Sequence, residues 1–256
     1  MSAQRRTAWL VPILTLVLAL SGCGGHVLPE IHSNADRLSQ AHEFYDDGSY
    51  AEAIELLKAY TMSASGAADV DEGIYLLGRC YLKTHDWGLA AVEFERLLKD
   101  YPESDSAGSA SFRLGEAYFG QSRKPDFDQE YTLKALDQWQ SYLATYPDHW
   151  LVGGAKGKIL EARTRLAKKL VATGNLYLKL KYPDPARIYF QRVVDEYSDT
   201  PMRPHALLGL AREESRFPNP DKAIALYKQI ESEYPKSAVA NDAARERKRL
   251  EHRKKR

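Results

Sequence analysis

One thiol near the N-terminus has a setting that predicts covalent chemistry. Cys23 ends the run Leu20-Ser21-Gly22-Cys23, which follows a basic N-terminal segment and the apolar stretch 8–20. This arrangement is typical of a bacterial lipobox, in which diacylglycerol alkylates the thiol and a signal peptidase removes the residues before it. An apolar run of about thirteen residues is also too short to cross the hydrocarbon core of a bilayer. The sequence therefore predicts a signal peptide at 1–22 and an acylated Cys23 that anchors the protein to a membrane.

The other cysteine, Cys80, has a different setting. It lies among the apolar residues Leu76, Leu77 and Tyr81 of a helical stretch. A buried cysteine of this kind behaves as a small hydrophobic side chain, so we do not expect Cys80 to be reactive. Since acylation occupies Cys23, no intramolecular disulfide is possible, and packing alone must stabilise the fold.

Residue types that could hold a metal ion or form an active site are present, but their spacing is wrong. The seven histidines are scattered, and none forms the His-Glu-x-x-His pattern of a zinc protease helix. The segment Gly153–Lys158 is similar to a phosphate-binding loop, but Val152 occupies the first glycine position and Ile159 replaces the magnesium-binding Ser or Thr. No Gly-x-Ser-x-Gly elbow occurs. We therefore expect no metal, no cofactor and no catalytic activity.

Charge gives no support for a nucleic-acid partner, because Lys and Arg exceed Asp and Glu by 36 to 35. The one charge block is the basic segment 245–256. It could attach to anionic lipid head groups or to an acidic partner. It could equally be a helix end whose positive charge suits the helix dipole and solubility. The sequence leaves both interpretations open.

The elements that must position any binding residue follow a repeat of about 34 residues. The segment Asp71–Pro102 shows its pattern of small and aromatic residues on two helices, at Ile74, Leu77, Gly78, Tyr81, Ala90, Phe94, Leu97 and Pro102. Small residues let two antiparallel helices approach closely, and aromatic residues fill the space beside them. Proline stands where the second helix must stop. This is the tetratricopeptide pattern.

Four further copies of the pattern follow the same logic. They centre on Ala41–Tyr60, Leu114–Pro147, Leu170–Val193 and Pro204–Pro235, and the copy at Leu114 has a long loop at about 121–129. The sequence predicts an all-α tetratricopeptide solenoid of about five helix pairs. It also predicts a long connecting helix from about 151 to 180 and a capping helix from 237 to about 252. The expected boundaries are a tether at 23–34, the superhelical domain at 35–252 and a basic tail at 253–256.

Turns are expected where polar residues and prolines separate the apolar stretches. They are Asp46-Asp47-Gly48, Thr84-His85-Asp86 and Pro183-Asp184-Pro185. Side chains of these types can cap the helix that follows.

A binding surface is expected along the first helices of the pairs, because these line the concave groove of such a solenoid. A groove of this type binds an extended peptide through a few anchoring side chains. The first-helix residues that are not part of the packing pattern are the candidates: Tyr75, Arg79, Lys83, Arg113 and Glu116.

Taken together, the lipobox, the repeats and the long loop resemble the YfiO/ComL (BamD) family, the tetratricopeptide lipoproteins of the outer-membrane β-barrel assembly machinery. The most specific stretches are Phe112–Tyr118, Phe127–Thr132 with Ala135-Leu136, and Leu170–Lys179. The resemblance covers essentially all of the mature chain. It departs at 181–186, where Pro183 and Pro185 replace the glycine or short turn usual in the family.

The resemblance implies a non-enzymatic scaffold, anchored by lipid to the outer membrane and facing the periplasm. The N-terminal repeats would receive the C-terminal signal strand of unfolded β-barrel outer-membrane proteins. The C-terminal repeats would dock onto the POTRA domain of BamA nearest the barrel, beside other lipoproteins of the machinery. Gly24, which is not Asp, agrees with transport to the outer membrane.

Two other classes of protein stay open. One is another tetratricopeptide lipoprotein, such as a pilotin for secretin or pilus assembly, against which the phenylalanine-rich third repeat and its long loop argue. The other is an envelope enzyme such as a peptidoglycan hydrolase, against which the lack of a catalytic constellation argues.

Overall fold

The computed structural model describes residues 33–64, 66–216 and 220–254. Throughout these ranges the regular secondary structure consists of eleven α-helices and no strand. The prediction of an all-α fold is therefore confirmed. The predicted signal peptide and Cys23 lie outside the described residues.

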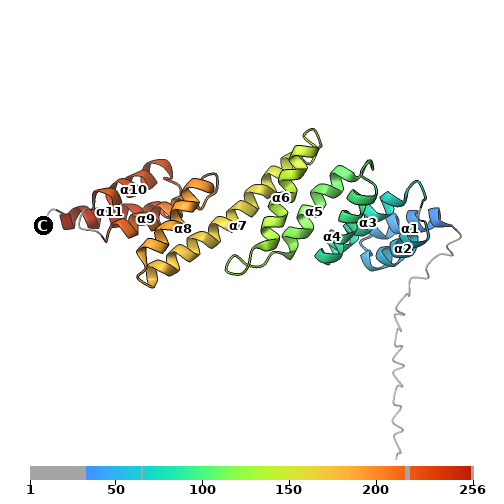
Figure 1. The fold of residues 1–256 in the computed structure, drawn as a ribbon, viewed down its shortest axis with the longest axis horizontal. Helices are drawn as coiled ribbons and strands as arrows, with labels where there is room; N and C mark the ends of the chain where they lie inside the picture. Colours follow the sequence, from blue (N-terminus) through green and yellow to red (C-terminus); the bar gives the residue numbers. More distant parts are fainter. Residues whose placement is uncertain (1–32, 65, 217–219, 255–256) are drawn as a thin grey trace, which may run out of the picture. The chain divides into compact units, whose positions relative to one another are not determined.

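The helices follow one another in pairs, and each packs against the next in the chain (Figure 1). Their bounds are α1 Asn34–Asp46, α2 Tyr50–Ser63, α3 Val70–Lys83, α4 Trp87–Asp100, α5 Ala107–Gln121, α6 Glu130–Thr145, α7 Val152–Lys179, α8 Pro183–Glu196, α9 Arg203–Glu214, α10 Asp221–Glu233 and α11 Ala240–Lys254. The first ten make the five predicted pairs and α11 covers the last of them. The first helices α1, α3 and α5 also contact one another in sequence, as do α7 and α9. First helices thus form two rows, α1–α3–α5 and α7–α9, on which side chains of successive repeats can meet.

Close contact within three of the pairs, α3/α4, α5/α6 and α7/α8, depends on a glycine beneath an aromatic ring. A Cβ atom at Gly78 would lie 2.6 Å from the ring of Phe94, and one at Gly174 would lie 2.7 Å from the ring of Phe190. These distances are shorter than real side chains tolerate, so the glycines let α3 approach α4 and α7 approach α8. The predicted pairing of small and aromatic residues is confirmed at these crossings.

Aromatic side chains fill the interior, and their polar atoms find partners. The largest completely buried side chains include Trp139 and Tyr227. Trp139 Nε1 donates a hydrogen bond to the carbonyl of Phe112 at 3.1 Å, and the Tyr227 hydroxyl donates to Glu246 at 3.0 Å. These bonds satisfy donors that would otherwise be costly to bury, and they tie neighbouring helices together.

The expected turns are correct in two places and wrong in one. Residues 47–49 and 84–86 separate helices as predicted, with Gly48 at φ 80° and His85 at φ 64°. Pro183 instead begins α8, and the turn lies at 180–182 with Lys181 at φ 65°. Proline suits the first helical turn because its missing N–H would have no partner there.

The expected side-chain caps of these turns are also wrong. No side chain caps the first turn of α2, α4 or α8. The Asp86 carboxylate accepts a hydrogen bond from the Thr84 hydroxyl at 2.5 Å instead. A capping side chain is seen at α1, where Ser33 Oγ accepts from the amide of Asp36 at 3.1 Å.

Helix ends differ slightly from the expected boundaries. With Ser33 as its cap, α1 begins at Asn34, one residue before the predicted domain. The last helix begins at Ala240 rather than 237 and continues to Lys254, so the first two residues of the predicted tail are helical. The long helix α7 and the long loop before α6 agree with the predictions. Among the helices described, none is both long and apolar enough to cross a membrane.

Candidate functional site

The five predicted peptide-binding residues lie on two adjacent first helices. Tyr75, Arg79 and Lys83 are four residues apart on α3, and Arg113 and Glu116 are three apart on α5. Both spacings put side chains on one helix face. Because α3 contacts α5, the two sets can meet in the row of first helices.

Arg79 connects this surface to the first repeat. Its guanidinium donates a hydrogen bond to the Tyr45 hydroxyl at 3.0 Å and lies 4.3 Å from the centre of the Tyr45 ring. The same guanidinium lies 5.7 Å from the ring centre of Tyr75. Arg79 therefore holds two aromatic faces from α1 and α3 around one positive charge.

Arg113 brings the third repeat into the same cluster. Its Nη1 pairs with Glu116 Oε2 at 2.6 Å, and the two side chains are 31% and 23% exposed. Burial alone would lower the pKa of Arg113, but the charge of Glu116 and hydrogen bonds to Glu116 and Tyr75 raise it. Arg113 Nε is buried and has no hydrogen-bond acceptor among the described residues, so the guanidinium meets its partners through its outer nitrogens.

Lys83 is the member of the predicted set that stands apart. It is exposed in the last turn of α3. About two helical turns separate it from Tyr75. The structure thus brings together four of the five predicted residues.

A cavity of about 440 Å³ adjoins the cluster and has an acidic rim. Tyr75 and Arg79 line it, and the sequence analysis missed its other polar residues, which are His42, Asp69, Asp71, Glu72, Ser104, Asp105 and Ser106. His42 Nε2 lies 2.9 Å from Glu72 Oε1, so α1 and α3 meet at the rim. The acidic start of α3 was the available sequence signal. The cavity offers many hydrogen-bond acceptors beside one aromatic and cationic cluster, a composition that suits binding of a peptide backbone.

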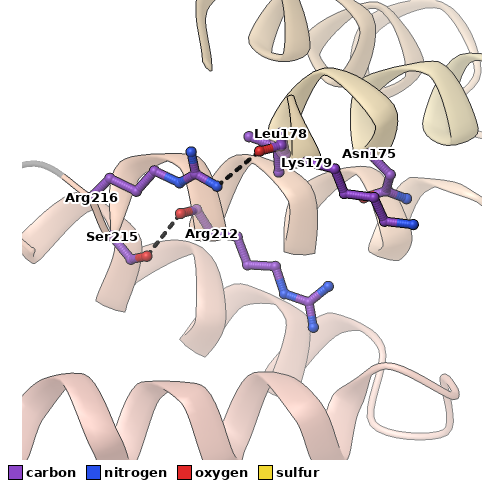
Figure 2. Close-up of a pocket in the computed structure, with 6 residues that line it drawn as sticks. All are labelled: Asn175, Leu178, Lys179, Arg212, Ser215 and Arg216. Carbon is purple, nitrogen blue, oxygen red and sulfur yellow. Dashed lines mark hydrogen bonds between the residues drawn. The ribbon is translucent and has the colours of Figure 1, made fainter. Parts of the chain in front are cut away.

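A second cavity, of about 570 Å³, lies near the C-terminal ends of α7 and α9 (Figure 2). Its lining residues are Asn175, Leu178, Lys179, Arg212, Ser215 and Arg216. Arg216 donates a hydrogen bond to the carbonyl of Leu178 at 3.2 Å, which joins α7 to the residues after α9. Nothing in the sequence analysis pointed to this cavity, because its residues come from helices far apart in the chain.

Ion pairs fix the helices around this second cavity. Arg212 binds Glu246 of α11 through two nitrogens, with the shortest contact at 2.6 Å. Arg247 of α11 pairs with Glu231 of α10 at 2.7 Å. These pairs fasten α9, α10 and α11 to one another, so the last repeat is a well-ordered support for a binding surface.

The described residues contain no group of three or more metal-ligating side chains that could hold a metal ion. Cys80 is completely buried, and burial raises the pKa of its thiol to about 12. A thiol of this kind is protonated at neutral pH and is a poor nucleophile. The prediction that Cys80 is a buried hydrophobic residue is confirmed.

Helix pairs that stack in chain order over glycine–aromatic crossings define a tetratricopeptide-repeat protein. A tetratricopeptide-repeat family model also matches residues 206–237, which span α9 and α10. The model of the YfiO family, described as outer membrane lipoprotein, matches residues 32–218, so the chain belongs to that family. The resemblance inferred from the sequence is thereby confirmed.

One curated relative is the outer membrane protein assembly factor BamD of Caulobacter vibrioides. It is 24% identical over 212 residues, which cover 81% of this chain and 70% of that protein. Similar solved structures include a tetratricopeptide repeat protein from Parabacteroides merdae, at 18% identity and a TM-score of 0.38, covering 85% of this chain and 72% of that one. Another is the thermophilic protein TTC0263 of Thermus thermophilus, at 18% identity and a TM-score of 0.37, covering 85% and 98%.

Proposed function

We propose that this protein is a non-catalytic scaffold for the assembly of β-barrel proteins in the outer membrane. The observation that carries the proposal is membership of the outer membrane lipoprotein family over residues 32–218. A relative named as an outer membrane protein assembly factor supports it. An acyl chain on Cys23 would anchor the scaffold to the outer membrane, on the side that faces the periplasm.

The N-terminal repeats are the proposed receptor for unfolded β-barrel proteins. Tyr75 and Arg79 offer an aromatic face and a positive charge, and Arg113 adds a second positive charge beside Tyr75. The acidic rim supplies acceptors for backbone amides. The backbone groups of an extended peptide need hydrogen-bond partners, and the side chains of this surface can supply them. This supports an extended segment of a client protein as the ligand of the N-terminal repeats.

The C-terminal repeats are the proposed docking surface for BamA, beside the other lipoproteins of the machinery. The ion pairs that fasten α9, α10 and α11 support a rigid platform here. A scaffold that holds client and BamA together raises the effective concentration of one near the other without any chemical step. This action needs no cofactor, metal or nucleic acid.

Affinity purification of the tagged, full-length protein from outer membranes tests this function. BamA and unfolded β-barrel proteins are expected to co-purify with it in mild detergent. Recovery of a secretin in place of BamA would identify a pilotin, which is the alternative. Clearing zones in a peptidoglycan zymogram of the purified protein would contradict a non-catalytic role.

A further inference from the structure

Three adjoining cavities near the C-terminal end of the chain are lined by six cations and a single carboxylate. The cavity between α7 and α9 shares Ser215 with a second of about 220 Å³ beside α11. The second shares Arg249 and Arg253 with a third of about 460 Å³. We call this surface the basic strip, and its cations are Lys179, Arg212, Arg216, Lys248, Arg249 and Arg253.

Acidic residues are nearly absent from the basic strip. Glu246 is the one carboxylate among its lining residues in the described chain, and Arg212 already pairs with it at 2.6 Å. Arg216 donates a hydrogen bond to the carbonyl of Leu178 (Figure 2). Lys179 and Arg249 have no carboxylate partner among the described residues. The strip therefore carries positive charge that nothing within the described chain neutralises.

The helix α11 carries two kinds of cation, those paired with carboxylates and those that line the cavities. Arg247 pairs with Glu231 and Glu251, Arg245 pairs with Asp242, and Lys254 pairs with Asp221. Lys248, Arg249 and Arg253 line the cavities instead. Three cations of α11 are therefore neutralised by carboxylates, whereas the three that line the cavities have no carboxylate partner among the described residues.

We infer that the basic strip binds an extended acidic polypeptide segment, whose carboxylates seat against Lys179, Arg216 and Arg249. Leu178 and Leu250 give its cavities an apolar floor, and Asn175 and Ser215 offer hydrogen bonds to a peptide backbone. Cavities with an apolar floor and hydrogen-bonding groups favour a polypeptide over a membrane, because a flat layer of lipid head groups does not enter them. The strip lies on the C-terminal repeats, but its test uses neither BamA nor a client protein.

Binding is tested with the full-length protein in non-ionic detergent and a short fluorescein-labelled peptide rich in Asp and Glu. Fluorescence anisotropy should show binding that weakens as ionic strength rises. Lys179→Glu combined with Arg249→Glu should weaken the peptide by at least about tenfold. The matched control is Lys222→Glu combined with Lys228→Glu, two exposed lysines of α10, and it should leave the affinity within about twofold.

Three results would overturn the inference. One is equal weakening by both pairs of reversals, which would show attraction by net charge alone. Another is no binding of the peptide while vesicles containing phosphatidylglycerol bind, which would make the strip a membrane contact. A third is full binding by Lys179→Gln combined with Arg249→Gln, a neutral pair that also guards against misfolding of the reversed variant. None of these experiments uses BamA, so their failure is distinguishable from failure of the proposed function.

Discussion

The carboxylate of Glu213 is completely buried and accepts two hydrogen bonds from a single arginine, Arg187. The two contacts measure 2.8 and 2.9 Å and connect α8 with α9, across the boundary between the fourth and fifth repeats. A buried carboxylate is costly unless it is paired, so the boundary depends on this arginine.

Arg187→Ala should lower the free energy of unfolding by about 2 kcal/mol or more, because it strips a buried charge of its partner. Chemical denaturation of the full-length protein measures this change. The matched control is Arg192→Ala, which removes an arginine from an exposed pair with Glu196 on the same helix. We expect that control to cost less than about 0.5 kcal/mol. Equal losses in the two variants would show that the buried pair has no special role.

Gly78→Ala should destabilise the protein, because the new Cβ would lie 2.6 Å from the Phe94 ring. Overpacking of this kind costs about 1–3 kcal/mol. Gly157→Ala is a control within helix α7, where nothing lies within 4 Å of the new atom, and it should stabilise by about 0.5–1 kcal/mol. Thermal unfolding compares the two variants. A gain in stability for Gly78→Ala would contradict the assigned crossing of α3 and α4.

Local spacing was enough to predict the helix pairs. The contacts of Gly78 with Phe94 and of Gly174 with Phe190 join residues of the same pair, sixteen positions apart, so a repeat of small and aromatic residues reports them directly. The turn at 180–182 could not be placed in the same way. Proline both ends and begins helices, and only the backbone shows that Pro183 does the second.

The binding surfaces also differ in how much of them local spacing could predict. Tyr75, Arg79 and Arg113 were predictable because the repeat shows which helix positions are not used for packing. The acidic rim was not predicted, and of the basic strip only the cations within 245–256 were singled out, since the other members come from separate helices and loops. Lys179, Arg212 and Arg249, for example, belong to α7, α9 and α11, and only the packing of first helices brings them into adjoining cavities.

Acid should weaken the link between α9 and α11. Burial would raise the pKa of Glu246, but hydrogen bonds from Arg212 and Tyr227 and the charge of Arg212 lower it overall. A carboxyl whose pKa is lowered by folding stabilises the protein above its unfolded pKa, about 4.3, and this stabilisation is lost as pH falls through the folded pKa.

The comparison that checks this is denaturation of wild type and Glu246→Gln at several pH values. The wild type should be more stable by about 1 kcal/mol at pH 7, and the gap should close as pH falls below about 4. When both proteins also carry Arg212→Gln, the difference in their stability should be small at every pH. A gap that is independent of pH would show that the ion pair does not stabilise the fold.

Cys23→Ser should abolish membrane attachment, because a hydroxyl cannot take the thioether-linked diacylglycerol that the lipobox predicts. The protein should then be unprocessed or released, which membrane fractionation and the mass of the mature chain both report. Cys80→Ala is the matched control, since that cysteine is buried, and the variant should stay in the outer-membrane fraction. Normal acylated material from Cys23→Ser would refute the anchor.

Substitutions of Tyr75 and Lys83 should affect client binding differently, because Tyr75 belongs to the cluster and Lys83 stands apart from it. A labelled peptide from the C-terminal strand of an outer-membrane β-barrel protein serves as the probe. Tyr75→Ala should weaken it by about tenfold, because Tyr75 lies between the charges of Arg79 and Arg113 and lines the cavity. Lys83→Ala should leave binding within about twofold, since this exposed side chain lies about two turns away.

The same titration separates a ligand contact from a structural effect. Arg113→Lys keeps a positive charge but loses the planar guanidinium that pairs with Glu116. If the guanidinium contacts the peptide, Arg113→Lys should weaken binding while the unfolding midpoint stays near that of the wild type. Equal affinity of Tyr75→Ala, Arg113→Lys and Lys83→Ala would place the client elsewhere on the protein, because the three substitutions sample the cluster and its surroundings on one face.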